Sequence, residues 1–160
     1  MRKFRTTHLV AHSAREMYAL VADVDSYPQF LPLCEDLTVL ERKKNADGED
    51  VLVARMTVAY KFFRETFSTR VTLDPGNLFI LVEYLDGPFR HLENRWRFLP
   101  VNDTSCEVDF YIEYEFASRS MQMLMGAMFE KAFTKFTAAF EERAHQVYGK
   151  GAGSASASLD

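Results

Sequence analysis

The ionisable and nucleophilic side chains are the first candidates for chemistry, and their spacing supports neither catalysis nor metal binding. The four histidines lack the helical pair spacing and the adjacent cysteine pair that a zinc site needs: His8, His12, His91 and His145. Cys34 and Cys106 lie far apart and form no redox motif, so we expect two reduced thiols in the core or in a pocket wall. The sequence has no glycine-rich phosphate loop and no serine nucleophile elbow. We therefore expect no catalytic residue, no metal and no cofactor.

The carboxylates offer one further route to an enzyme. Glu113 and Glu115 form a pair, but both alternate with apolar residues in a way that turns them to solvent. Glu65 and Glu83 lie on strands whose faces the pattern leaves ambiguous. Either could be an acid inside a cavity, and we favour a strand-end salt bridge for each. We expect that the chain is not an enzyme.

The chemistry that the sequence does support is the binding of an apolar molecule. Apolar side chains recur at three- and four-residue spacing between Arg119 and Val147, which places them on one face of a long helix: Met121, Met125, Met128, Phe129, Ala132, Phe133, Phe136 and Phe140. Methionine is flexible and polarizable, so such a face can cover a solid core or accept varied apolar ligands. We expect both uses. Phe136 and Phe140 are predicted to be core, and the part from Met121 to Phe133 is predicted to be a ligand wall.

This helix follows a series of elements that must position it. Residues from Phe4 to Val10 read as a strand, and Ser13 with Glu16 forms a capping box that starts a helix. Prolines in the segment from Tyr27 to Pro32 end that helix and permit a second short one. Turn signals then recur at hairpin spacing: Asn45 to Gly48, Asp74 to Asn77, Asp86 to Pro88 and Pro100 to Asp103. The turn between Tyr60 and Phe62 carries no clear signal.

The strands between these turns alternate between apolar and polar residues, which predicts an antiparallel sheet with one wet face. A curved sheet wrapped around a long C-terminal helix is the helix-grip arrangement, an α+β fold, with two short helices after the first strand. Such a sheet is too curved for the helix to fill its concavity, so a cavity between them is expected. We expect one domain over residues 1–148 and a disordered Gly-, Ala- and Ser-rich tail over residues 149–160.

The residues expected on the dry face or at the cavity mouth form the candidate binding site. They are Tyr27, Phe30, Leu31, Leu33, Met56, Tyr60, Asn94, Trp96, Phe110, Tyr114, Met121, Met125, Phe129 and Phe133. The loop from Tyr27 to Leu33 could be a gate for a lipid or a tight apolar anchor, and the two interpretations remain open. Asn94 could donate to a ligand carbonyl, but a partner within the protein is the favoured interpretation. Tyr60 and Tyr114 could aim a hydroxyl at a ligand or lie at the cavity rim.

Two segments resemble motifs of a known family. The run from Ala22 to Cys34, with the sequence ADVDSYPQFLPLC, resembles the signature of the coenzyme Q-binding START-domain family. Asp86-Gly87-Pro88-Phe89, followed by Leu92 and Trp96-Arg97-Phe98, is similar to a second motif of that family. The resemblance extends from about Phe4 to Val147. The family also includes the bacterial ribosome association toxin and belongs to the polyketide cyclase and START-like superfamily.

The resemblance implies that the chain binds ubiquinone or a related polyprenyl lipid, in support of respiration and quinone biosynthesis. It leaves two alternatives, a regulator that binds the large ribosomal subunit and a polyketide cyclase or aromatase. Several cations lie on strand faces that look solvated, where they could contact ribosomal RNA or anionic lipid heads: Lys61, Arg64, Arg70, Arg95 and Arg97. We favour a wet sheet face on which these cations pair with neighbouring carboxylates.

Composition and charge narrow the partners further. The net charge of −4 gives no indication of DNA binding. The sequence contains 14 Phe and 7 Tyr, and aromatic residues of this kind often line ligand pockets. No secretory signal, mitochondrial transit peptide or membrane-length apolar run is recognisable. We therefore expect a bacterial cytoplasmic protein with possible peripheral contact at the inner face of the plasma membrane.

Overall fold

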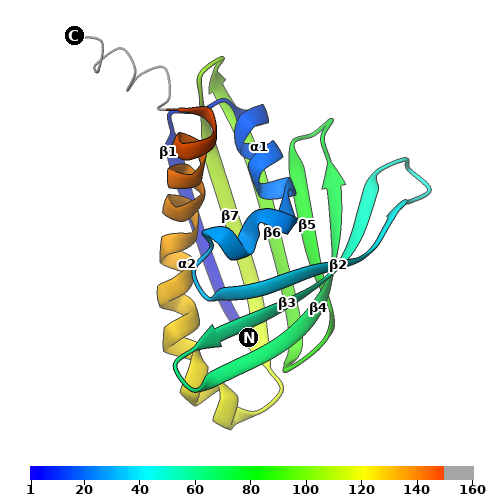
Figure 1. Cartoon of the computed structure of the whole chain (residues 1–160), viewed down its shortest axis with the longest axis vertical. Coiled ribbons are helices and arrows are strands. Elements are labelled where there is room, and N and C mark those ends of the chain that lie inside the picture. Colours follow the sequence, from blue (N-terminus) through cyan, green and yellow to red (C-terminus); the bar gives the residue numbers. More distant parts are fainter. Residues whose placement is uncertain (150–160) are drawn as a thin grey trace.

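The structure is a computed structural model, and it describes residues 1–149 (Figure 1). Seven strands, two α-helices and one 3-10 helix follow one another in this order: β1 (Arg2–Val10), α1 (Ala14–Ala22), η1 (Val24–Gln29), β2 (Cys34–Lys44), β3 (Asp50–Tyr60), β4 (Phe63–Asp74), β5 (Phe79–Asp86), β6 (Phe89–Asn102), β7 (Ser105–Phe116) and α2 (Arg119–Tyr148). All neighbouring strands pair antiparallel in the order β1-β7-β6-β5-β4-β3-β2. The predicted tail from residue 150 onward lies outside the described residues.

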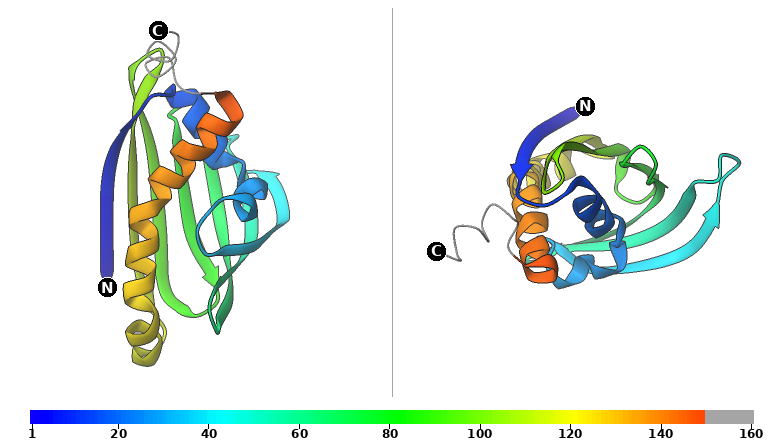
Figure 2. Two further views of the ribbon diagram at one scale, coloured as in Figure 1. Left: turned by 60° about the vertical axis from the view of Figure 1, so that its left-hand side comes forward. Right: turned by 90° about the horizontal axis from the view of Figure 1, so that it is seen from above.

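The sheet curves into an arc, and α2 closes its open side. Seen from above, the arc surrounds α1 and η1, and α2 crosses between the two ends of the sheet (Figure 2). The inward-facing side chains of β7 are buried without exception from Cys106 to Phe116. They pack against the buried face of α2, which includes Phe129, Phe133 and Phe140. The helix-grip α+β fold predicted from the strand pattern is thereby confirmed.

The first helix begins as its sequence predicts. The Ser13 hydroxyl accepts a hydrogen bond from the Glu16 backbone at 3.1 Å, and the Glu16 carboxylate accepts one from the Ser13 backbone at 3.1 Å. Met17 and Val21 on this helix are fully buried, so α1 is anchored inside the arc by its apolar face. Pro28 lies within η1, which is a single short 3-10 segment. Because α1 and η1 occupy one end of the arc, they do not fill the space between the sheet and the middle of α2.

The structure confirms one predicted hairpin turn, explains the turn that had no signal and corrects a third. Asn45 caps its turn by accepting from the backbone of Asp47 and Glu49, as its position predicts. The turn between β3 and β4 had no signal because Lys61, at φ +56°, takes the left-handed conformation that glycine usually supplies. The predicted turn from Pro100 to Asp103 is wrong in its first part, since β6 continues through Asn102.

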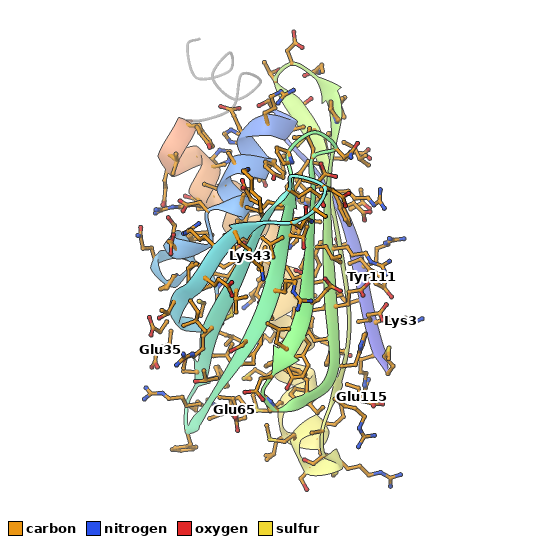
Figure 3. The ribbon with its side chains drawn as sticks, turned by 90° about the vertical axis from the view of Figure 1, so that its right-hand side faces the viewer. Lys3, Glu35, Lys43, Glu65, Tyr111 and Glu115 are labelled. Atoms are coloured by element: carbon orange, nitrogen blue, oxygen red, sulfur yellow. The ribbon has the colours of Figure 1, made fainter. Side chains whose placement is uncertain are left out.

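The outer face of the sheet carries paired charges (Figure 3). Arg95 pairs with Glu93, Arg5 lies 3.6 Å from Asp109, and the Arg5 and Arg95 guanidinium groups stack on the Tyr111 ring. Of the five cations expected to pair on this face, Arg64 and Arg95 do so, with Glu35 and Glu93. Within residues 1–149, Lys61, Arg70 and Arg97 have no ion-pair partner, so the favoured interpretation holds only in part. No helix within residues 1–149 is long and apolar enough to cross a membrane.

Candidate functional site

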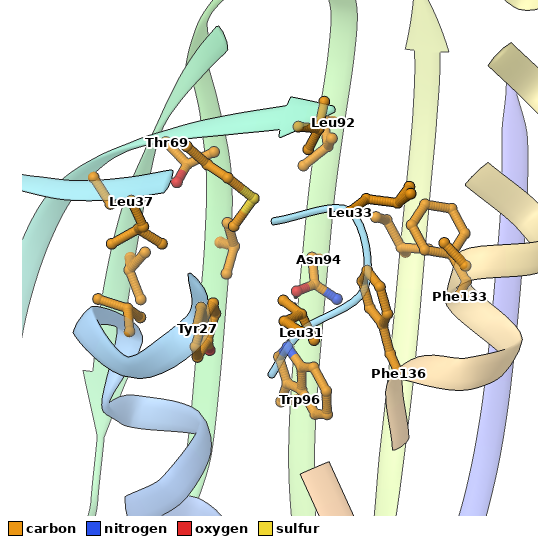
Figure 4. A pocket seen from close by; sticks show the side chains of 18 of the residues that line it. Tyr27, Leu31, Leu33, Leu37, Thr69, Leu92, Asn94, Trp96, Phe133 and Phe136 are labelled. Atoms are coloured by element: carbon orange, nitrogen blue, oxygen red, sulfur yellow. Dashed lines mark hydrogen bonds between the residues drawn. The ribbon is translucent and has the colours of Figure 1, made fainter. Parts of the chain in front are cut away.

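A cavity lies between the concave face of the sheet, the η1–β2 loop and the middle of α2 (Figure 4). Its empty volume is about 970 Å³ when the open mouth is included, and the centre of a water molecule can reach about 120 Å³ of it. Its wall includes side chains from η1, from β2 to β7, from α2 and from the loop after η1. Among the predicted site residues, those that line it are Tyr27, Leu31, Leu33, Met56, Asn94, Trp96, Phe110, Phe129 and Phe133.

The cavity wall is almost wholly apolar. Within the described part of the chain, no Asp, Glu, His, Lys or Arg lines it. Its side chains with polar atoms are Tyr27, Thr69, Asn94 and Trp96. An apolar cavity of this kind favours apolar ligands. Glu65 and Glu83, weighed as cavity acids, are not part of the wall, so the structure does not support that role.

The Asn94 amide has partners within the protein on both of its polar atoms. Its nitrogen donates to the Tyr111 carbonyl at 2.8 Å, and its oxygen accepts from the Trp96 indole nitrogen at 2.8 Å. The Asn94 amide is therefore bonded within the protein, which was the favoured interpretation. One amide hydrogen and one lone pair remain, and these are what Asn94 can offer to a ligand.

The η1 segment and the loop after it form one side of the cavity. The Tyr27 hydroxyl donates to the Val21 carbonyl, and burial raises the pKa of this hydroxyl far above its ordinary value. Leu31 and Leu33 extend from the loop toward the sheet and α2 (Figure 4). Leu33 has φ +69°, and its carbonyl accepts from the Ala59 backbone at 3.0 Å. A leucine in the left-handed region costs roughly 1–2 kcal/mol, so the surrounding contacts must hold this loop in place.

The thiol next to this loop is not a nucleophile at neutral pH. Cys34 and Cys106 are both free and buried. Burial raises the pKa of the Cys34 thiol to about 11, with the nearby Asp36 acting in the same direction. The reactive form of cysteine is the thiolate, so the buried group stays protonated and inert. Within residues 1–149, no group of three His, Cys, Asp or Glu side chains could hold a metal ion.

The division predicted for the Met and Phe face of α2 is wrong at both ends, although Phe129 and Phe133 line the cavity as predicted. The cavity is lined by the later part of the face: Phe129, Ala132, Phe133, Phe136 and Phe140. Phe140, predicted to be core only, packs at 5.2 Å from the Trp96 ring and also reaches the cavity. Met121 and Met125, predicted to be ligand wall, do not line it. Met125 is buried in the core, and Met121 is half-buried against it.

Three more predicted site residues lie outside the cavity wall. Phe30 does not line the cavity; its ring packs 5.1 Å from Phe140, with the Arg143 guanidinium over it. Tyr60 is exposed at the end of β3, beneath the Lys61 ammonium. Tyr114 is fully buried among phenylalanines of the core, and burial raises the pKa of its hydroxyl to about 12. The sequence pattern predicted both tyrosines in the binding site, and neither of them lines the cavity.

Sequence reasoning also left out a set of wall residues that share inward-facing strand positions. These include Leu37, Ala54, Phe67, Thr69, Ile80, Val82, Leu92 and Ile112. The alternation of apolar and polar residues places most of them on the dry face. That signal was available in the sequence, but it does not separate dry-face residues at the cavity from those against the helix.

Comparison with known proteins gives the family once this geometry is known. Residues 10–141 match the family model described as polyketide cyclase / dehydrase and lipid transport. The chain belongs to this family. The match covers the region from the end of β1 to the last part of α2, so it includes every element that lines the cavity.

Curated relatives of this chain carry two kinds of name. The ribosome association toxin RatA of Vibrio cholerae is 36% identical over 150 residues, which is 94% of this chain and 100% of the relative. The coenzyme Q-binding protein COQ10 homolog B, mitochondrial, of Xenopus laevis is 30% identical over 152 residues, which is 92% of this chain and 60% of the relative.

Solved structures agree on the fold. The solution structure of an 18 kDa protein from Caulobacter crescentus is 34% identical, with a TM-score of 0.76, and the match covers 93% of this chain and 99% of that one. The Zhui aromatase/cyclase of a Streptomyces species has a TM-score of 0.80 at 19% identity, with 91% of this chain and 94% of that one covered. At that identity the likeness to the cyclase shows the fold alone.

Proposed function

We propose that this protein binds ubiquinone or a related polyprenyl lipid in the cavity, as a carrier or chaperone that supports respiration and quinone biosynthesis. The observation that carries the proposal is the wall itself, which is apolar throughout and in which the Asn94 amide keeps one free donor. A prenyl tail needs only apolar burial, which contributes about 25 cal/mol per Å². A quinone carbonyl needs one hydrogen-bond donor, which the free amide hydrogen can supply.

The size of the cavity limits how such a lipid would be held. Pockets that enclose a drug-sized molecule measure roughly 300–1,000 Å³. The cavity reaches this range only when its open mouth is counted, at about 970 Å³. A long prenyl chain would therefore extend out through the mouth, with its head or its first units held inside. Rotation of flexible wall side chains such as Met56 would enlarge the space.

A cavity-filling variant tests this proposal. Ala132 on α2 is buried in the wall, whereas Ala138 on the same helix faces solvent. We expect Ala132→Leu to place its side chain in the cavity and to abolish retention of quinone, with the fold intact. Protein purified from a quinone-producing host is extracted with organic solvent, and the extract is analysed for prenyl lipids. Ala138→Leu is the matched control and should retain lipid like the original chain.

The same experiment can overturn the proposal. If the unaltered protein carries no prenyl lipid and binds no added quinone, the proposal fails. If Ala132→Leu folds and retains as much lipid as Ala138→Leu, the lipid is bound outside this cavity.

A second candidate function is association with the large ribosomal subunit. It is supported by the names of relatives 36% identical over nearly the whole chain, in Vibrio cholerae and in Escherichia coli. Exposed cations without an ion-pair partner in the described part of the chain, such as Lys61, Arg70 and Arg119, are groups that could contact RNA. Sedimentation profiles of ribosomes should then show fewer joined subunits when the protein is added, and unchanged profiles would exclude this function.

The cyclase interpretation has less support than either. Cyclase chemistry needs an ionisable pair near the substrate, and the described wall has tyrosine as its sole ionisable side chain. The Tyr27 hydroxyl is engaged by the Val21 carbonyl and its pKa is raised by burial. A group in that state is a poor general base at neutral pH.

A further inference from the structure

One end of the molecule displays large apolar side chains that nothing in the described chain covers. Phe62, in the turn between β3 and β4, has 103% of its reference surface exposed. On the first two turns of α2, Met123 is 85% exposed and Leu124 is 74% exposed. The β3–β4 turn and the start of α2 lie at the same end of the fold in both side views (Figures 1 and 2). We call Phe62, Met123 and Leu124 the apolar tip.

The composition of the first turns of α2 explains why these side chains are bare. Met121 and Met125 rest on or within the core, while Met123 and Leu124 on the other side of the helix face outward. A helix that is apolar on all sides is normally buried on all sides. Exposed apolar surface of this kind marks a site of contact with another apolar surface.

Cations flank the apolar tip. Lys61 precedes Phe62, and Arg119 is the first residue of α2. Neither forms an ion pair with any residue of the described chain. Glu65 lies near the same end of the fold (Figure 3) and has no ion-pair partner within residues 1–149, so the charge balance there is mixed. Apolar insertion must therefore supply most of any binding energy, with the two cations adjacent to the inserted residues aiding contact with anionic lipid.

The apolar tip adjoins the cavity from both sides. Ala59, three residues before Phe62, hydrogen-bonds the carbonyl of Leu33, which lines the cavity. On α2, the wall residue Phe129 lies five positions after Leu124, which corresponds to a rise of about 8 Å along the helix axis. The tip and the cavity wall are thus parts of the same two segments of the fold.

We propose that the apolar tip docks onto a lipid bilayer that contains anionic lipids, so that a prenyl lipid passes between the bilayer and the cavity. This inference rests on the proposed function, because a prenyl lipid resides in a bilayer and a carrier must reach it there. The three large apolar side chains of the apolar tip project from two separate segments, the β3–β4 turn and α2, and therefore fit a deformable bilayer better than a rigid partner. A rigid protein surface would have to offer a pocket for each of them.

Vesicle flotation with the full chain tests the docking. The vesicles consist of phosphatidylcholine alone or of phosphatidylcholine mixed with phosphatidylglycerol. We expect the protein to float with both and more strongly with the anionic mixture. Because Phe62 and Leu124 contact little within the fold, Phe62→Ser and Leu124→Ser should fold normally and lower the partition coefficient by about tenfold each. Lys61→Glu and Arg119→Glu should remove only the gain from phosphatidylglycerol.

The opposite end of the fold supplies a matched control. Leu99 and Val101 are also exposed apolar residues, near the turn between β6 and β7. Leu99→Ser and Val101→Ser should leave flotation unchanged. If the original chain does not float, or if the tip variants float as well as these controls, the inference is wrong.

Two further readouts distinguish membrane docking from a damaged cavity and from ribosome contact. Phe62 does not line the cavity, so purified Phe62→Ser should still bind quinone that is added in solution. Loss of flotation with binding of added quinone intact is the expected result, whereas a failure of the original chain to bind added quinone would reject the proposed function itself. If Phe62→Ser and Leu124→Ser instead abolish cosedimentation with ribosomal subunits and the original chain does not float, the tip is a ribosome contact and the membrane inference is overturned.

Discussion

Asn94 joins two strands and one aromatic ring at the floor of the cavity. Its amide connects the β7 backbone at Tyr111 to the Trp96 indole, and the contact with Trp96 is buried while the contact with Tyr111 is partly buried. Trp96 in turn packs edge-to-face with Phe110 at 4.8 Å and with Phe140 at 5.2 Å. One amide therefore orients the ring on which a large part of the aromatic wall rests.

We predict that Asn94→Ala lowers the free energy of unfolding by about 1–3 kcal/mol, because it leaves the buried Trp96 N–H without an acceptor. Urea unfolding, followed by Trp96 fluorescence, measures the change. Thr69→Val, in the same wall, is the control, since the Thr69 hydroxyl holds no other side chain within the described residues. Equal stabilities for the Asn94→Ala variant and the original chain would contradict the role given to this amide.

The alternation of apolar and polar residues in the sequence predicts which face of the sheet a wall residue lies on. It does not predict whether that residue lies beside the cavity, in the solid core or at the end of its strand. Asn94, Trp96 and Phe110 were placed inside by alternation, and all three line the cavity. Tyr60 and Tyr114 obey the same alternation, yet Tyr60 is exposed at a strand end and Tyr114 lies in the core. Alternation reports which side of a sheet a residue faces. Where the opposing helix leaves space is a property of the packed molecule.

At the scale of elements, the sequence predicts the extent of α2 but not which of its turns cover the cavity. Its apolar period predicted the helix to within one residue at its C-terminal end, since it runs from Arg119 to Tyr148. The period could not tell which turns lie over the cavity, because that depends on how far the helix has crossed the sheet at each turn. The Met-rich first turns lie beyond the cavity, and the Phe-rich middle lies over it.

The first turns of α2 also contain a glycine in a helix interior, and we predict that Gly126→Ala raises the free energy of unfolding by about 0.5–1 kcal/mol. The added Cβ would lie 2.3 Å from the Gln122 side-chain nitrogen, which is the end of a flexible chain. That nitrogen is buried without a hydrogen-bond partner, so its displacement toward water carries little cost. Thermal unfolding measures the result.

Gly87 provides the contrast. It has φ +142°, and an added Cβ would lie 2.5 Å from the Cβ of Phe67 and 3.0 Å from its Cα. Backbone atoms cannot move aside as the end of a side chain can, so Gly87→Ala should lower the stability. A stability gain at Gly87, or a loss at Gly126, would show that these contacts do not decide the effect.

At the scale of the whole molecule, two histidines join segments far apart in the sequence. His12, in the turn between β1 and α1, is buried and lies 2.8 Å from the His145 ring on the last turns of α2. Burial, with a smaller contribution from the nearby His145, lowers the pKa of His12 below its ordinary value, although Glu16 and Glu141 oppose this. The folded chain therefore holds a neutral His12 where the unfolded chain takes up a proton.

We predict from this a loss of stability in mild acid. Above the ordinary histidine pKa of about 6.5, both states are neutral and the contribution is constant. As the pH falls through that value, His12 binds a proton in the unfolded chain but stays neutral in the folded chain. The free energy of unfolding therefore drops until the pH reaches the lower pKa of His12 in the folded chain. Denaturant titrations at a series of pH values should show this loss, and it should be smaller for His12→Gln. His8→Gln, at an exposed position, should leave the slope as in the original chain.

The two edges of the sheet bear on how the protein behaves when it is concentrated. The outer edge of β1 is spanned by contacts to α2, including Arg2 with Glu130 at 3.4 Å and His8 with Glu141 at 3.3 Å. The other edge is β2, which has two register shifts and ends in the exposed charged run from Glu41 to Lys44. Bulges and charges on an edge strand obstruct the addition of a further strand from another molecule. The fold thus protects an open sheet against growth into aggregates while the apolar tip remains bare.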